Sequence, residues 1–194
     1  MTLVMAFIGE KGAVMAGDLR EITFVGDPSS TERLEGELYT GTIATDAELR
    51  RRAGELGVWL DIRDDKVKVT ERAGVLVGEV SSLEKGVLRR RRLYASGGSY
   101  TIVDTDGSSA APRGSGGPGN FVVLGNEKTK AVARRCIAAG WRSGGLAEAR
   151  ALIDRTMRIA AGETPSVSRE YRILETAERT DARGLADPGD VGSS

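Results

Sequence analysis

The chain opens with two apolar runs that are separated by a short polar turn. Leu3–Ile8 and Ala13–Ala16 are almost entirely hydrophobic, and a glycine-flanked Glu-Lys pair lies between them. Two extended runs joined by such a turn predict a β-hairpin. The second run leads directly into Gly-Asp-Leu-Arg at positions 17–20, so we expect Asp18 to lie beside the start of the first strand.

The remaining pattern predicts strands that are segregated from helices. Further strands are expected near 22–26, 58–62, 67–69, 75–80, 87–94, 100–103, 121–124 and 168–174. Helices are expected near 30–37, 46–56, from 126 onward and at 146–161, where Ser29 with Glu32, Thr45 with Glu48, and Asn126 provide caps. The segment 104–119 is rich in Gly, Ser and Pro and is expected to be a loop. This order favours the α+β class.

One domain and a short tail account for the whole length. Residues 1–175 carry the periodic apolar pattern, whereas 176–194 are polar and glycine-rich and predict a disordered tail. The tail contains Asp187-Pro188-Gly189, and Asp-Pro-Gly is a common turn sequence.

Composition narrows the choice of partner and compartment. The 28 basic residues equal the 28 acidic ones, which argues against nucleic acid as the main partner. No apolar run reaches the roughly 20 residues that span a bilayer, so we expect a protein that is not membrane-embedded. No signal segment precedes the first strand, which favours a cytoplasmic location. The single cysteine, Cys136, leaves no multi-cysteine metal site and is expected to pack in a helix core.

The absence of histidine narrows the candidate chemistry. With no histidine, Ser-His-Asp and Cys-His catalysis and ordinary zinc sites are excluded. A base must then be a lysine, a carboxylate or a terminal amine. Thr2 follows the initiating methionine, and an N-terminal threonine can use its own α-amine as the base.

Two charged residues are candidates for assisting Thr2. Asp18 ends the second strand of the hairpin, and Lys68 lies in the strand predicted at 67–69. Lys66, two residues away on the same strand face, is an alternative. A lysine ammonium would lower the pKa of the α-amine, and the aspartate would hold that ammonium in place. Asp18 could also merely pair with Arg20 at a turn.

These three positions resemble the N-terminal nucleophile (Ntn) hydrolase plan of proteasome β-subunits. The resemblance implies a sandwich of two β-sheets with helices, and catalytic roles for Thr2, Asp18 and Lys68. It places Ser82 where the family has an oxyanion amide, although glycine is expected there. Arg20, Asn126 and Ser166 fall at supporting positions, where the residue types match only in part.

A closer resemblance extends over residues 2–174. The stretches GEKGAVMAGDLR, ELYTGTI, VLVGEVSS, RRRRLY and TPSVSREY are similar to the connectase family of methanogenic archaea. The resemblance implies a peptide ligase that cleaves after Asp in a Lys-Asp-Pro-Gly-Ala-like motif and rejoins the fragment to a proline-starting chain. Its partner would be a subunit of the membrane methyltransferase of methanogenesis, and no cofactor is expected.

Two other functions stay open from the sequence. The same site would serve a proteasome-like threonine protease or amidohydrolase. A catalytically silent binding protein that retains Met1 is the other alternative. The Arg89–Arg92 run alternates between the two faces of a strand, and we interpret it as a solvated edge that discourages strand pairing.

Overall fold

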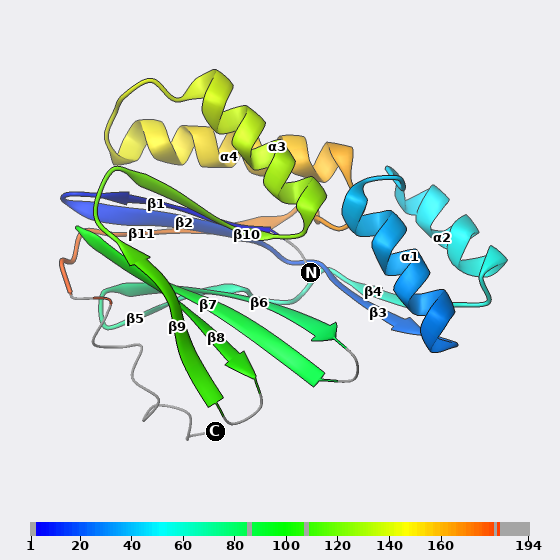
Figure 1. Cartoon of the computed structure of the whole chain (residues 1–194). Coiled ribbons are helices and arrows are strands. Elements are labelled where there is room, and N and C mark those ends of the chain that lie inside the picture. The colour runs from blue at the N-terminus through cyan, green and yellow to red at the C-terminus, as the bar shows by residue number, and fades with distance from the viewer. Residues whose placement is uncertain (1–2, 85–86, 107–108, 181, 183–194) are drawn as a thin grey trace.

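The computed structural model describes residues 3–84, 87–106, 109–180 and 182, and the protein has a mixed α+β fold with antiparallel sheets and four helices (Figure 1). The strands are β1 (Leu3–Gly9), β2 (Gly12–Asp18), β3 (Glu21–Val25), β4 (Trp59–Arg63), β5 (Val69–Arg72), β6 (Val75–Glu84), β7 (Val87–Ser96), β8 (Ser99–Asp106), β9 (Ser109–Gly116), β10 (Asn120–Gly125) and β11 (Tyr171–Thr176). The helices are α1 (Pro28–Thr40), α2 (Asp46–Glu55), α3 (Glu127–Gly140) and α4 (Leu146–Glu163).

The predicted hairpin forms the centre of a four-stranded sheet. Its order is β10-β1-β2-β11, and every pair is antiparallel. Leu3, Met5 and Phe7 pack toward α3 and α4, whereas the intervening residues of β1 pack toward the second sheet. Because both faces of β1 are covered, the strand is an almost unbroken apolar run.

The second sheet is a five-stranded meander that lies against the first. Its order is β5-β6-β7-β8-β9, and a shared core joins the two sheets (Figure 1). Helices α3 and α4 cover the outer face of the first sheet, and Cys136 is buried there, which confirms its predicted core position. The sheets approach closely at Gly78, where an added Cβ would lie 2.7 Å from both Met15 Sδ and Val4 Cγ1.

Helices α1 and α2 pack on the β3-β4 ribbon and form a separate small core. The predicted capping box of α2 is confirmed, because Thr45 and Glu48 bond reciprocally to each other's backbone N–H groups. The cap predicted at Ser29 is wrong. Asp27 caps α1 instead, since Pro28 occupies the first turn, where its missing N–H costs nothing.

Three further predictions need correction. The segment 104–119 is not a loop: it contains the end of β8 and all of β9, an exposed edge strand held by its backbone ladder with β8. The strand expected at 67–69 is Val69–Arg72. The arginine-bearing strand β7 is not an edge, since it pairs with both β6 and β8. Carboxylates on the neighbouring strands form ion pairs with its arginines, as in the Arg91–Asp104 pair at 2.5 Å.

The described part of the C-terminal segment returns to the second sheet. After β11, the Glu178 carbonyl accepts a hydrogen bond from the Gly97 N–H at 2.7 Å, and Ala182 is fully buried. The Asp187-Pro188-Gly189 sequence lies outside the described residues. None of the helices in the described ranges is long and apolar enough to cross a membrane.

Candidate functional site

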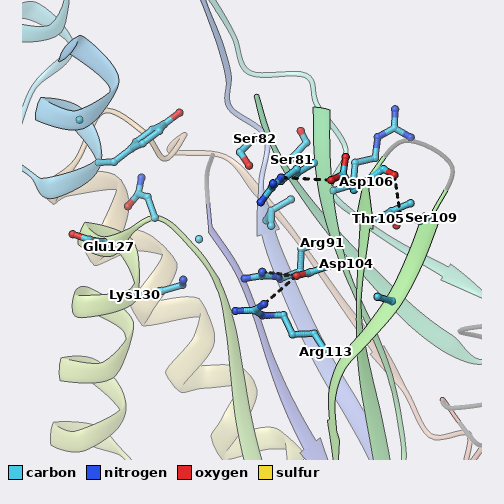
Figure 2. A pocket seen from close by; sticks show the side chains of 18 of the residues that line it. Ser81, Ser82, Arg91, Asp104, Thr105, Asp106, Ser109, Arg113, Glu127 and Lys130 are labelled. Atoms are coloured by element: carbon cyan, nitrogen blue, oxygen red, sulfur yellow. Dashed lines mark hydrogen bonds and ion pairs between the residues drawn. The ribbon is translucent and has the colours of Figure 1, made fainter. Parts of the chain in front are cut away.

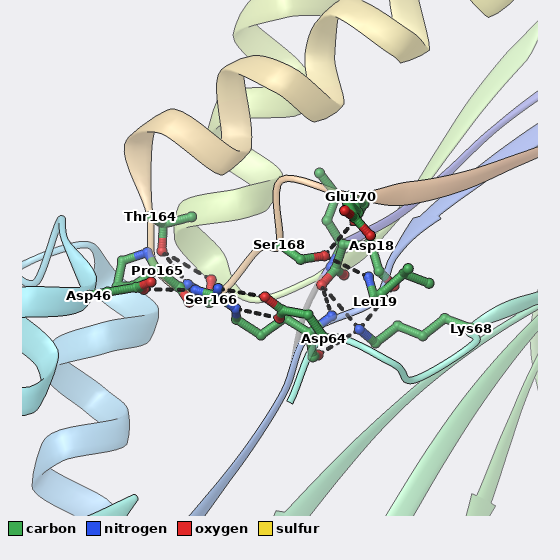
Figure 3. A network of polar contacts seen from close by, with 12 residues as sticks. Asp18, Leu19, Asp46, Asp64, Lys68, Thr164, Pro165, Ser166, Ser168 and Glu170 are labelled. Carbon is green, nitrogen blue, oxygen red and sulfur yellow. Dashed lines mark hydrogen bonds and ion pairs between the residues drawn. The ribbon is translucent and has the colours of Figure 1, made fainter. Parts of the chain in front are cut away.

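The carboxylate of Asp18 lies at the end of β2 and is fully buried (Figure 3). Its Oδ1 accepts a hydrogen bond from the Leu3 N–H at 2.9 Å. Its Oδ2 accepts from the Arg20 N–H at 2.9 Å and from Lys68 Nζ at 3.1 Å. Every partner is a donor, which suits the ionised carboxylate because it can only accept. Asp18 therefore connects the start of β1 to the lysine.

The Lys68 side chain is almost completely buried, and its ammonium faces three oxygens. Nζ donates to Asp18 Oδ2, to the Asp18 carbonyl at 3.1 Å and to the Arg20 carbonyl at 2.6 Å. Three acceptors match the three N–H groups of an ammonium. Burial lowers the pKa of Lys68, and the charge and hydrogen bond of Asp18 oppose that shift.

The alternative lysine has a different environment. The Lys66 side chain is 50% exposed, and its ammonium lies 3.5 Å from Glu21 on β3. Its backbone N–H donates to the Leu19 carbonyl at 2.9 Å, which anchors the segment that leads to Lys68. Of the two lysines that the sequence left open, only Lys68 contacts Asp18.

Arg20 joins three segments that are far apart in the chain. Its guanidinium donates two hydrogen bonds of 2.8 Å to Asp64, one of 2.7 Å to Asp46 and one of 2.9 Å to the Pro165 carbonyl. The hydrogen bonds to Asp64 are the main cause of a raised pKa at Arg20, against the opposing effect of burial. Arg20 thus positions the backbone of residues 18–20, whose carbonyls accept hydrogen bonds from Lys68.

A second polar cluster lies at the start of α3 and the end of α4. Asn126 caps α3 by accepting from the Thr129 N–H at 2.9 Å, and its Nδ2 donates to Ser166 Oγ at 3.0 Å. Ser166 Oγ also lies 3.0 Å from Thr164 Oγ1, and all these side chains are buried. The two supporting residues predicted here are therefore in direct contact.

Three contributors to the network were missed by sequence reasoning. Ser168 Oγ accepts from the Leu19 N–H at 2.8 Å and donates to the Glu170 carbonyl at 2.5 Å. Asp46 and Asp64 hold Arg20, as described above. Ser168 was placed within a strand and Asp64 in a turn, and nothing in their local pattern indicates a partner more than forty residues away.

Ser82 lies on β6 beside two cavities. One cavity, of about 670 Å³, is also lined by Arg20 and Lys68. The other, of about 710 Å³, is also lined by Asn126 (Figure 2). Ser82 thus stands between the two polar clusters, although no hydrogen bond joins it to either cluster among the described residues.

Thr2 lies outside the described residues. Its covalent neighbour Leu3 is described, and the Leu3 N–H is the group that Asp18 Oδ1 binds. The Asp18 carboxylate therefore binds both the buried Lys68 ammonium and the Leu3 N–H, which is the first backbone group that the structure describes. Such a cation can stabilise negative charge or disfavour a second positive charge nearby, since burial weakens solvent screening.

A protein-family model matches most of the chain. The family model described as "Connectase MJ0548-like, N-terminal domain" matches residues 1–186. No protein of curated function matches the chain.

The chain also has low similarity to several solved structures. Anbu (ancestral beta-subunit) from Yersinia bercovieri has a TM-score of 0.42 at 11% identity, over 90% of this chain and 80% of that chain. The helical assembly of the Anbu complex from Pseudomonas aeruginosa has a TM-score of 0.42 at 10% identity, over the same shares. An Anbu (Gly-1) mutant from Hyphomicrobium sp. strain MC1 has 0.38 at 12%, over 96% and 92%.

Proposed function

The chain belongs to the connectase family, and from that premise we propose that it is an N-terminal-threonine peptide ligase. The observation that carries the proposal is the buried Lys68–Asp18 ion pair, whose carboxylate also binds the N–H of the residue that follows Thr2. In this proposal the two face-to-face sheets with their helical layer are an Ntn-hydrolase sandwich, and Met1 is removed to free the α-amine of Thr2.

In the first step, the Thr2 hydroxyl attacks the carbonyl carbon of an aspartyl residue in a Lys-Asp-Pro-Gly-Ala-like motif. The hydroxyl proton moves to the α-amine, directly or through a water molecule, and then to the departing proline nitrogen. The C–O ester bond forms as the C–N peptide bond breaks. The N-terminal fragment is then an ester on Thr2.

The second step reverses the first with another chain. The nitrogen of a proline-starting peptide attacks the ester carbonyl, the new C–N bond forms, and the proton returns through the α-amine to the Thr2 oxygen. The ester conserves much of the free energy of the peptide bond, so no nucleotide or cofactor is required. Ligation prevails over hydrolysis where the incoming amine is held close and water is excluded.

Lys68 acts by charge in this scheme. Its three N–H groups already face three oxygens, so we assign it no hydrogen bond to substrate. Its ammonium would favour the neutral α-amine and stabilise the developing negative charge on the hydroxyl oxygen. Asp18 keeps the ammonium charged and in place, and Arg20, Asn126 and Ser166 hold the surrounding backbone. Ser82, at the junction of the two cavities, is the candidate provider of an oxyanion N–H.

A peptide-exchange experiment tests the proposal. Two peptides that contain Lys-Asp-Pro-Gly-Ala with different flanks are mixed with the protein, and the products are identified by mass spectrometry. Hybrid peptides with swapped flanks are expected, and Thr2→Ala should abolish them. Cleaved fragments without hybrids would support a threonine protease instead. An intact mass that still includes Met1 would exclude both activities and favour a binding protein.

The cellular partner in this proposal is a protein that carries such a motif in an accessible segment. For the family, that partner belongs to the membrane methyltransferase of methanogenesis. The proposed reaction takes place in the cytoplasm.

A further inference from the structure

A cavity of about 710 Å³ lies beside the candidate site, between the β7–β9 strands and the start of α3 (Figure 2). Tyr39, Ser81 and Ser82 line both this cavity and the neighbouring one that contains Arg20 and Lys68. The two cavities therefore adjoin, and a polypeptide bound at the candidate site can extend from one into the other.

The cavity has an excess of positive charge. Five cationic side chains and three carboxylates line it, namely Arg89, Arg90, Arg91, Arg113 and Lys130 with Asp104, Asp106 and Glu127. Arg89 lies 3.9 Å from Asp106, and Glu127 is exposed on the first turn of α3. The lining residues have an excess of two positive charges, and one of these cations, Arg90, also lies 4.0 Å from Glu79 on β6, outside the lining.

One carboxylate serves two of these guanidinium groups. Arg91 donates two hydrogen bonds to Asp104, at 2.5 and 2.8 Å. Arg113 reaches the same carboxylate at 3.4 Å, a long contact on an exposed edge strand. The guanidinium of Arg113 therefore has N–H groups available for another acceptor, because Arg carries five donors.

Lys130 projects from α3 toward these arginines (Figure 2). Burial lowers the pKa of Lys130, and the charges of Arg91 and Arg134 lower it further, against the opposing effect of Glu127. Among the described residues, no carboxylate forms an ion pair with its ammonium. An added anion would relieve this repulsion, since it would place a negative charge among three cations.

We propose that this basic cavity binds carboxylate side chains in an acidic stretch of the protein substrate, next to the cleaved motif. The inference rests on the proposed function for the identity of the substrate. A cavity of this size accommodates a few side chains, and guanidinium groups bind carboxylates with two parallel hydrogen bonds. An extended chain advances about 3.3–3.6 Å per residue, so an acidic residue only a few positions from the motif can reach it.

The test uses two sets of motif peptides that differ only in the flanks. One set carries two Glu residues within four positions of the motif, on the N-terminal or on the C-terminal side, and the matched set carries Gln. We expect the kcat/KM of exchange to be about tenfold higher for one Glu-flanked peptide, as expected for one or two charge-assisted hydrogen bonds. High salt should reduce this preference.

Three variants assign the effect to the cavity. Lys130→Gln and Arg113→Gln should each reduce the preference for Glu about threefold or more. Lys130→Glu should reverse it, so that Lys-flanked peptides become the better substrates. Lys11→Gln, which removes one charge from the exposed β1–β2 turn, should leave the preference unchanged.

Equal kcat/KM values for Glu and Gln flanks on both sides, or a preference that survives Lys130→Glu, would overturn the inference. If no peptide is exchanged at all, the proposed function fails, and the cavity is then tested by binding alone. Fluorescence anisotropy of labelled Glu-flanked and Gln-flanked peptides provides that measurement. Tighter binding of the Glu-flanked peptide, lost in Lys130→Gln, would still support the cavity, and equal binding would refute it.

Discussion

Replacing Asp18 by Asn tests how the buried ion pair is held together. The substitution preserves shape but removes the negative charge that faces the Lys68 ammonium. The one remaining oxygen can take the place of Oδ1 and accept from the Leu3 N–H, or take the place of Oδ2 and accept from the Arg20 N–H and Lys68. The new amide N–H₂ then faces the donors that the other oxygen had accepted. An uncompensated buried charge costs about 3–5 kcal/mol, and an unsatisfied N–H about 1–3 kcal/mol.

We expect Asp18→Asn to lower the free energy of unfolding by about 4 kcal/mol, at the lower end of the combined range, because Lys68 can release its proton. Urea unfolding of Asp18→Asn, Lys68→Met and the double variant measures the coupling. Removal of both charges avoids the unpaired ammonium, so the double variant should be at least about 2 kcal/mol more stable than additivity predicts. Additive effects within about 0.5 kcal/mol would refute the ion-pair account.

The pH dependence adds an independent readout. In Asp18→Asn the pKa of Lys68 should fall further below its ordinary value of 10.5, since burial lowers it and the carboxylate no longer opposes the shift. Between the folded and unfolded pKa values the unfolded chain binds more protons, so stability rises with pH. The cost of the substitution should therefore shrink as the pH approaches 10.5, and a cost independent of pH would contradict the reasoning.

Four further predictions concern other positions in the chain. Gly78→Ala should destabilise the protein by about 1–3 kcal/mol in urea unfolding, because its Cβ would lie 2.7 Å from two side chains of the opposite sheet. Gly36→Ala on α1, where nothing lies within 4 Å, should instead stabilise it by about 0.5–1 kcal/mol. The hydrogen bond from Arg52 is the main cause that lowers the pKa of Glu37 to about 2. The stability that Glu37 contributes should therefore be complete above its ordinary pKa of 4.5 and be lost as the pH falls toward 2. Glu37→Gln should remove this dependence of stability on acid pH. Arg20→Lys should lose the two hydrogen bonds to Asp64. We expect exchange activity to fall at least about tenfold, with a smaller change in KM than in kcat. Activity equal to that of the unchanged protein would argue against a positioning role.

Local patterns are sufficient to predict the hairpin, the helices and the position of Asp18 beside the first strand. The glycine-flanked turn sets a register in which Val4 pairs with Gly17, so Asp18 lies beside the start of β1. The choice between Lys66 and Lys68 was not local. Both lie just ahead of β5, and only the packing of that segment against residues 18–20 decides which ammonium is buried.

The predictions for the arginine-bearing strand and for the Gly/Ser segment are wrong for related physical reasons. A charged run predicts a solvent-exposed edge strand. Arg89 and Arg90 are exposed, but β7 pairs with both β6 and β8, where carboxylates on the adjacent strands form ion pairs with its guanidinium groups. The segment 109–116 has poor strand propensity, yet β9 forms because backbone pairing with β8 supplies its partners. Contacts with the neighbouring strands override the preference of each strand alone.

The position of β1 between β10 and β2 also determines when the first sheet can form during synthesis. β1 is made long before its neighbour β10, which begins only at Asn120, so the first sheet cannot close around β1 until that strand has been made. At about 5–20 residues per second, the ribosome takes roughly 6–24 s to reach that point. During this interval Leu3, which pairs with Gly125 in the folded protein, has no partner on that side. In the proposed function Met1 must be removed, so a slow aminopeptidase would reduce the fraction of active molecules.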